Sequence, residues 1–193
     1  VDLSNLQRQI IHQEGRIGYN KAASAQQQIH AINPDVQCHL ITERMDTAQL
    51  AHIVPQVDVV IDASDNFATR HAINAACVAA KKPLVSGAAV RFDGQISVFD
   101  SRQAGAPCYH CLFPDEGEAQ DMPCAQMGVF SPMVGIIGSM QAAEALKLLL
   151  GIGNTLQGRL LVLDGLAMQW RTLHFTQDPS CPVCHPATKP SVP

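Results

Sequence analysis

Two Cys-x-x-Cys pairs, Cys108/Cys111 and Cys181/Cys184, constrain the fold of this chain most. Each pair can hold one side of a tetrahedral metal, and four thiolates complete the coordination of Zn²⁺ with no position left for water. A site closed in this way is structural, so the chemistry lies elsewhere. Zinc ribbons separate their pairs by roughly 15–20 residues, whereas most of a domain lies between these two. We therefore predict a zinc ion that ties the C-terminal end to the middle of the chain. A disulfide pairing and four free thiols are the alternatives.

The composition is that of a compact globular domain. The chain has 193 residues, of which 47% are apolar and 16% are charged, which is enough to build a core. Its net charge of −4 argues against a nucleic-acid-binding protein, which carries an excess of basic residues. Seven cysteines without an N-terminal signal-peptide pattern fit a reducing cytoplasm. Glu144 and Lys147 interrupt the apolar stretch 127–150, which predicts a buried helix and no membrane span.

Helical and strand patterns alternate along the chain, which predicts an α/β fold. We expect helices over 19–32, from a cap at 64–66 to about 81, and over 131–150, the last one capped by Ser131-Pro132. We expect strands over 36–42, 57–62, 83–90, 95–99, 159–163 and 168–175, with a turn near Asp93-Gly94. This order predicts a doubly wound sheet with an antiparallel C-terminal extension. Ligands bind such sheets at the carboxyl ends of strands, where we expect residues 4–9 and 62–66.

Charged residues in these two polar clusters could bind phosphate or a metal ion. The planar guanidinium group of Arg8 can donate two parallel hydrogen bonds to phosphate oxygens, and the ammonium group of Lys21 is a compact charge. This combination suits a triphosphate. Lys21 also adds to the positive dipole at the start of its helix. The alternative is that both are ordinary surface charges. Asp65 could hold Mg²⁺ through water or cap the helix that follows it.

A fifth cysteine, Cys124, lies in the acidic, aperiodic segment 114–127, which we expect to be a mobile loop. A loop thiol can act as a nucleophile, but no base can be placed beside it from the sequence, so an inert role is the alternative. His110 and His185 flank the metal pairs. We expect both to be bystanders, because four thiolates already complete the site.

Five segments in one order resemble the ThiF/MoeB/HesA family of adenylyltransferases, bacterial relatives of the ubiquitin-activating enzymes. They are SNLQRQ at 4–9, Lys21, DASDNFATR at 62–70, CYHC at 108–111 and CPVC at 181–184. The resemblance covers residues 1–185, and 186–193 is expected to be a disordered tail. The QWR segment around Trp170 and the PCAQMGV loop resemble ThiF, of thiamine synthesis, slightly more than MoeB, of molybdopterin synthesis.

The resemblance implies a Rossmann-like domain with a Cys₄ zinc site that uses ATP and Mg²⁺ to adenylate the C-terminal Gly-Gly carboxylate of a ubiquitin-like sulfur carrier. The nucleotide-binding residues that it implies are Ser4, Asn5, Leu6, Gln7, Arg8, Lys21, Asp65 and Asn66. Arg8 and Lys21 would grip the phosphates with the help of Asn5, and Asp65 would serve the adenylation step with its metal. The loop 114–127 would cross over the carrier tail and bring Cys124 near the activated carboxylate, as a further candidate catalytic residue.

The family's glycine-rich phosphate loop, acidic ribose ligand and arginine finger all precede the SNLQRQ motif. This chain has no G-x-G-x-x-G pattern and begins with Val1. We therefore expect an N-terminal segment with the first β-α-β unit to be missing. The alternative function is a truncated, non-catalytic, zinc-stabilised module that binds the carrier. The resemblance also implies a homodimer and, because no sulfurtransferase domain follows the zinc site, a separate sulfur donor.

Overall fold

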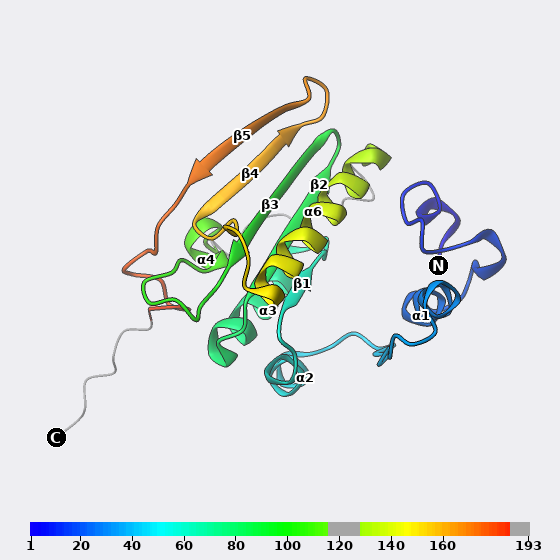
Figure 1. The fold of residues 1–193 in the computed structure, drawn as a ribbon, viewed down its shortest axis with the longest axis horizontal. Coiled ribbons are helices and arrows are strands. Elements are labelled where there is room, and N and C mark those ends of the chain that lie inside the picture. Colours follow the sequence, from blue (N-terminus) through cyan, green and yellow to red (C-terminus); the bar gives the residue numbers. More distant parts are fainter. Residues whose placement is uncertain (116–127, 186–193) are drawn as a thin grey trace. The chain divides into compact units, whose positions relative to one another are not determined.

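The chain forms two compact units, Val1–Asp46 and Thr47–Pro193. The computed structural model describes residues 1–115 and 128–185 (Figure 1). The first unit contains the 3₁₀ turns η1 (Leu3–Asn5) and η2 (Glu14–Arg16) and the helix α1 (Lys21–Ile32). The predicted tail at 186–193 lies outside the described residues.

Helix α1 confirms the helix expected over 19–32. Its N-cap is Asn20, whose Oδ1 accepts the N–H groups of Ala22 at 2.9 Å and Ala23 at 3.2 Å. The helix ends at Ile32, ahead of Asn33-Pro34, because a residue before proline is disfavoured in the helical region. The capping amide therefore bonds two of the N–H groups that a helix start leaves without intrahelical partners.

The segment 36–42 is not a strand, contrary to the alternation of its residues. Side-chain amides hold its backbone instead. Gln26 Nε2 donates to Cys38 O and Asn20 Nδ2 donates to Thr42 O, each at 3.1 Å. Residues 1–46, all of which the structure describes, contain no strand. Alternation predicts an extended backbone, but a strand also needs a hydrogen-bonded neighbour, which this unit does not provide.

A five-stranded mixed sheet forms the centre of the second unit, in the order β1-β2-β3-β4-β5 (Figure 1). Its strands are β1 (Val60–Asp62), β2 (Leu84–Val90), β3 (Asp93–Phe99), β4 (Arg159–Asp164) and β5 (Gln169–His174). β1 and β2 are parallel, and every later pair is antiparallel. The α/β fold with an antiparallel extension is therefore confirmed. Its parallel part, among the residues that the structure describes, is one strand pair.

Four helices and a 3₁₀ turn complete the part of the second unit that the structure describes. They are α2 (Thr47–Ile53), η3 (Val54–Gln56), α3 (Phe67–Ala80), α4 (Tyr109–Leu112) and α6 (Ser131–Leu150). α6 packs against β2 and β3, and α3 packs against β1, α2 and α4. The central core lies between α6 and the sheet and consists of Val85, Ile96, Val98, Ala145 and Leu156.

Helix α6 is long and apolar enough to cross a membrane by length and composition alone. The face toward the sheet carries the buried residues Met133 and Ile137, whereas Leu146 and Leu150 are 56% and 65% exposed. The expected buried helix is thus buried along one face, because the sheet covers a single side of it. Its cap also differs from the prediction: Ser131 is the first helical residue, and Phe130 is the N-cap.

The turn expected near Asp93-Gly94 lies two residues earlier, at Arg91 and Phe92, where Arg91 has a φ of 50°. Gly94 is inside β3, because α6 approaches the strand closely there. A Cβ on Gly94 would lie 2.8 Å from Ile137 Cγ1 and 2.9 Å from Met133 Cε. The glycine of the Asp-Gly pair is therefore explained by the close packing of a helix on the strand. A glycine required for such packing cannot be told from a turn glycine by its neighbours in the sequence.

Gly87 of β2 is the second point of close approach and provides a test of the packing. A Cβ there would lie 2.5 Å from Gln141 Cδ of α6. That amide is held by two buried bonds, from Nε2 to Asp62 O at 2.7 Å and to Val85 O at 3.3 Å. Gly87→Ala displaces it, so we expect the free energy of unfolding in urea to fall by about 1–3 kcal/mol.

Gly138→Ala is the matched control, because it adds the same methyl group to an open position on α6, where nothing lies within 4 Å. Its free energy of unfolding should rise by about 0.5–1 kcal/mol through helix propensity. Equal effects of the two substitutions would contradict the close approach at Gly87.

Candidate functional site

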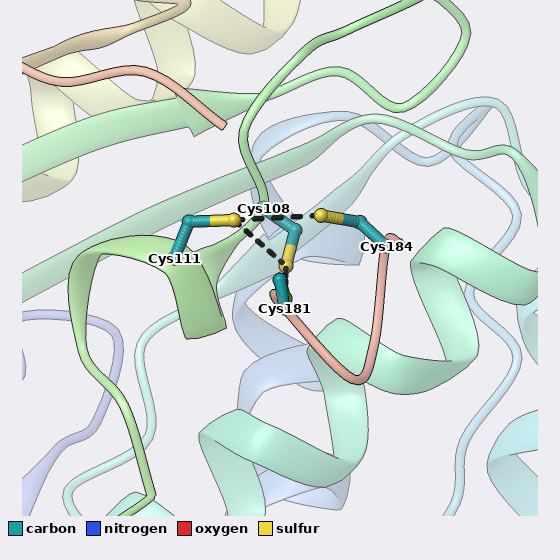
Figure 2. A group of neighbouring side chains, drawn as sticks. All are labelled: Cys108, Cys111, Cys181 and Cys184. Atoms are coloured by element: carbon teal, nitrogen blue, oxygen red, sulfur yellow. Dashed lines mark hydrogen bonds between the residues drawn. The ribbon is translucent and has the colours of Figure 1, made fainter. Parts of the chain in front are cut away.

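The four predicted metal ligands lie in one cluster (Figure 2). Cys108 precedes α4 and Cys111 lies within it, while Cys181 and Cys184 come from a turn after β5. The four Sγ atoms lie within 4.8 Å of one another, with 3.7 Å between Cys108 and Cys181 and 3.4 Å between Cys111 and Cys184. A tetrahedral site with Zn–S bonds of about 2.3 Å separates its sulfurs by about 3.8 Å. The spacing therefore fits a four-thiolate metal site.

All four cysteines are free thiols, which is contrary to the disulfide alternative. Cys108 and Cys181 are 2% and 0% exposed. Burial raises the pKa of Cys111 to about 11, and it also raises the pKa of Cys108, because a thiolate loses its solvation in the interior. A divalent cation would supply the opposing charge that these thiolates need, so the donor set is suited to a metal.

Each sulfur also has a nitrogen donor outside the set of ligands. The pairs are Asn74 Nδ2 to Cys108 Sγ (3.6 Å), Asp178 N to Cys111 Sγ (3.4 Å), His110 Nδ1 to Cys181 Sγ (3.8 Å) and Gln177 Nε2 to Cys184 Sγ (3.5 Å). His110 donates in its Nδ1–H tautomer, which fits the acceptance of the Asp115 N–H by Nε2 at 3.5 Å. Hydrogen bonds of this kind stabilise the charged thiolate and orient it. None of these contacts was predicted from the sequence. Asn74 in particular reaches Cys108 only through the fold, from 34 residues earlier in the chain.

His110 was expected to be a bystander and not a ligand, and the cluster of possible metal ligands consists of the four cysteines without it. The imidazole of His110 nevertheless contacts one of those cysteines. Its Nδ1 lies 3.8 Å from Cys181 Sγ, and its ring packs edge-on against His71 at 5.6 Å between centroids. His185 differs, because its contact with the cysteine segment is made by its backbone N–H, which donates to Cys181 O at 3.0 Å. His110 therefore adjoins a ligand of the metal site, although four thiolates still complete the coordination.

The polar segment 62–66 joins the carboxyl end of β1 to α3, as predicted. Two buried residues hold it in place. Asp62 is 2% exposed, and its Oδ1 accepts the Ser64 N–H at 2.9 Å. Arg70, which is 7% exposed, donates from its guanidinium to Ser64 O and, at 3.4 Å, to Gly87 O. The segment is therefore fixed from both sides, by its own first residue and by a residue of α3.

Asp65 is exposed and does not cap α3. The N-cap is Asn66, whose Oδ1 accepts the Thr69 N–H at 2.8 Å. The amide Nδ2 of the same Asn66 lies 3.5 Å from Asp65 Oδ1. The capping alternative for Asp65 is therefore wrong. Its carboxylate points to solvent at the end of a parallel strand, where sheets of this kind bind ligands.

The SNLQRQ motif belongs to the first unit and lies in η1 and the turn after it. Asn5 is 6% exposed, and its Oδ1 accepts the Asp2 N–H at 3.0 Å, which closes a capping box. Arg8 Nη1 donates to Ser4 O at 2.9 Å. This bond uses one of the five N–H groups of the guanidinium, so Arg8 is oriented and still has donors to offer.

Lys21 is exposed as the first residue of α1. Because Asn20 already bonds two N–H groups of this helix start, Lys21 can act there mainly through its own charge. Burial, and after it the charge of Lys21, lower the pKa of His12, whose Nδ1 lies 2.9 Å from Ser24 Oγ. The charge of Lys21 thus acts on His12, which follows the SNLQRQ motif by three residues.

Cys124 and residues 116–127 of the predicted loop lie outside the described residues. The crossover of the carrier tail and the role of Cys124 therefore stay predictions.

Several known proteins are similar in sequence to this chain over most of its length. The molybdopterin-synthase adenylyltransferase of Escherichia coli is 43% identical over 184 residues, which cover 95% of this chain and 73% of that protein. The sulfur carrier protein adenylyltransferase of Thermus thermophilus is 43% identical over 188 residues, covering 95% and 69%. An adenylyltransferase and sulfurtransferase, MOCS3-1 of Drosophila pseudoobscura pseudoobscura, is 42% identical over 186 residues, covering 95% of this chain and 41% of that protein.

Among solved structures, E. coli MccB with ATP has a TM-score of 0.81 at 19% sequence identity, and the match covers 95% of this chain and 56% of that one. At this identity the likeness shows the shared fold. Residues 1–183 match the ThiF family, so nearly every residue that the structure describes lies within the match. The chain belongs to the ThiF family.

Proposed function

We propose that this protein adenylates the C-terminal Gly-Gly carboxylate of a ubiquitin-like sulfur carrier at the expense of ATP. The observation that carries the proposal is the family match over residues 1–183, together with relatives named molybdopterin-synthase and sulfur carrier protein adenylyltransferases. Relatives with both kinds of name are about equally similar, so we identify the carrier by the chemistry of its tail and not by its pathway.

The reaction brings two anions together. The carrier carboxylate is already ionised at neutral pH, so it can attack the α-phosphorus of ATP without a side-chain base, and pyrophosphate leaves. Cations are needed to offset the repulsion and the charge that develops on the leaving group. We assign this task to Arg8 and Lys21. Magnesium, held through Asp65, would neutralise phosphate charge when it is bound.

The geometry around Asp65 supports this assignment. An exposed carboxylate on a mobile segment would lose its orientation, but segment 62–66 is fixed by Asp62 and Arg70. Asn66 starts α3 immediately afterwards. The carboxylate is therefore presented to solvent from a rigid turn, as a metal ligand or a substrate-positioning group requires.

We further propose that the four-cysteine cluster holds a structural Zn²⁺. All four positions of a tetrahedral ion would be occupied by thiolates, which leaves none for a substrate or a reactive water. The carrier, a second copy of the chain and a separate sulfur donor are the proposed partners, and the cytoplasm is the proposed compartment.

Exchange of labelled pyrophosphate into ATP tests the proposed reaction. With a purified carrier that ends in Gly-Gly, we expect exchange that depends on the carrier and on Mg²⁺. A carrier without its two terminal glycines is the control and should support none. Binding of the intact carrier without any exchange would instead support the second candidate, a non-catalytic zinc-stabilised carrier-binding module.

The phosphate-binding assignment predicts which charges matter. Arg8→Ala and Lys21→Ala should each slow pyrophosphate exchange by roughly 10²-fold, the loss expected for one preorganised donor. Asp65→Asn should slow it without loss of the fold. The controls are Arg44→Ala and Asp58→Asn, which change exposed charges of the same two units outside the motifs. Rates close to wild type in the three test variants would return these residues to ordinary surface roles.

The zinc assignment predicts one Zn²⁺ per chain in reduced protein, measured by elemental analysis. Cys181→Ser should lower that content well below one and lower the thermal unfolding midpoint, because structural zinc contributes about 10–16 kcal/mol of binding free energy in zinc-finger peptides. Cys38→Ser is the control, since Cys38 lies outside the cluster. Full zinc content in Cys181→Ser would contradict the assignment.

Zinc binding should also weaken as the pH falls. The pKa of Cys111 is raised to about 11 and that of Cys108 is raised too, so both are protonated thiols in the metal-free protein at neutral pH. Zinc must displace these protons, and acid restores them. Between about pH 8 and pH 6 the affinity, measured against a competing chelator, should fall by about tenfold or more per pH unit. An affinity independent of pH over this range would contradict thiolate ligation.

A further inference from the structure

We propose that Asn74 is a positioning residue of the metal site, which orients the thiolate of Cys108 and thereby couples metal binding to helix α3. The inference rests on the metal site proposed above. Asn74 lies in the middle of α3 and is 1% exposed. Its side chain contacts the CYHC segment 108–111 at two points, the Sγ atom of Cys108 and the backbone N–H of Tyr109.

The orientation of the amide follows from these two contacts. The N–H of Tyr109 can only donate, so the oxygen Oδ1 must face it, and it does so at 3.0 Å. Nδ2 then faces Cys108 Sγ at 3.6 Å, a distance suited to a bond from nitrogen to the larger sulfur atom. One planar group thus fixes both the sulfur and the backbone of the next residue.

Asn74 differs from the other three sulfur donors in where it comes from. His110, Gln177 and Asp178 belong to the two segments that carry the cysteines, so they organise each segment locally. Asn74 is 34 residues before Cys108 and belongs to a different element of the fold. Of these four donors, it is the one that comes from outside the two cysteine-carrying segments, and it ties α3 to the metal site.

Burial makes the bond to Cys108 effective. Both groups lie away from water, and Cys108 must carry a negative charge when it binds a metal. A hydrogen bond to a charged sulfur in such surroundings is stronger than one at the surface. Substitution of Asn74 would remove a buried hydrogen bond from the Tyr109 N–H, from the thiolate or from both, so the affinity for a metal ion would fall.

The same face of α3 also anchors the segment that carries Asp65. Arg70 lies one helical turn before Asn74, so the two side chains project from one face. Arg70 donates to Ser64 O, next to Asp65, while Asn74 donates to Cys108. The metal site and the proposed adenylation segment are therefore both attached to one short, rigid stretch of helix.

Asn74→Asp is the sharpest test, because it keeps the oxygen that faces Tyr109 and replaces the donor that faces Cys108 with an anionic acceptor. We expect zinc affinity, measured against a chelator, to fall by about 10–100-fold, as for other partners of metal ligands. Ala75→Asp is the matched control, since it places the same charge on the exposed side of the same helix and should leave the affinity at the wild-type value.

Asn74→Ala removes both bonds without burying a charge, so it provides a second measurement if the aspartate variant folds poorly. Its zinc affinity should also fall by about tenfold or more. The absorption spectrum of the Co²⁺-loaded variants should keep the visible bands of a tetrahedral four-thiolate site and shift its sulfur-to-cobalt charge-transfer band. Wild-type affinity in either folded variant would overturn the inference.

Hydrogen exchange on the wild-type protein tests the coupling without any substitution. Saturating zinc should raise the protection of amides in the 70–78 stretch of α3 by about tenfold or more. Unchanged protection there, in protein that binds zinc, would overturn the coupling. A wild-type protein that binds no zinc would instead defeat the proposed metal site itself, so the two failures are distinguishable.

Discussion

The second unit depends on a contact between two segments that are far apart in sequence, CYHC at 108–111 and CPVC at 181–184. Between them the chain forms α6, β4 and β5. All six residues of β5 are exposed, so this strand adds little to the core and is held mainly by its ladder to β4. The cysteine cluster fastens the chain beyond β5 to α4. The proposed metal ion would close this long loop and, because the four ligands come together only in the folded chain, its binding free energy would stabilise the folded state.

Helix α3 connects this contact to the rest of the domain through buried polar groups. It begins at the Asn66 cap, and its inner face carries Arg70 and Asn74, each bonded to a group outside the helix. Buried amides and guanidinium groups are tolerated because their donors are satisfied by backbone oxygens and a sulfur. The helix therefore orders the loop 62–66 and also holds the CYHC segment 108–111, which contains most of the short helix α4.

Much of this architecture could be predicted from residue patterns. The Cys-x-x-Cys pairs predicted the four-cysteine cluster, and the residue patterns over 57–62 and 131–150 predicted β1 and α6. These features depend on residues close together in sequence. The strand expected over 36–42 failed because a strand needs a partner, and alternation says nothing about one.

The remaining differences also come from contacts at long range. Gly94 resembled a turn residue, yet its small size serves the approach of α6. Asn74, Arg70 and Gln177 have no local signature, because asparagine, arginine and glutamine are common on ordinary helices and loops. Their importance arises only when the fold sets them beside a sulfur or a backbone oxygen. Asp65 and Asn66 are both residues that commonly cap helices. That Asn66 caps α3 could be decided only once the backbone of the turn was known.

The order of the cysteines along the chain has a consequence for how the protein is made. Ribosomes synthesise chains from the N-terminus at about 5–20 residues per second, so Cys108 and Cys111 emerge on the order of seconds before Cys181 and Cys184. During that interval the nascent chain holds half of its ligand set, and two thiolates bind a metal far more weakly than four. The proposed ion could be captured firmly only after α6, β4 and β5 have been translated. Capture of that ion would thus come late in the synthesis of this domain, and a chain that terminates before Cys181 would leave the ribosome without it.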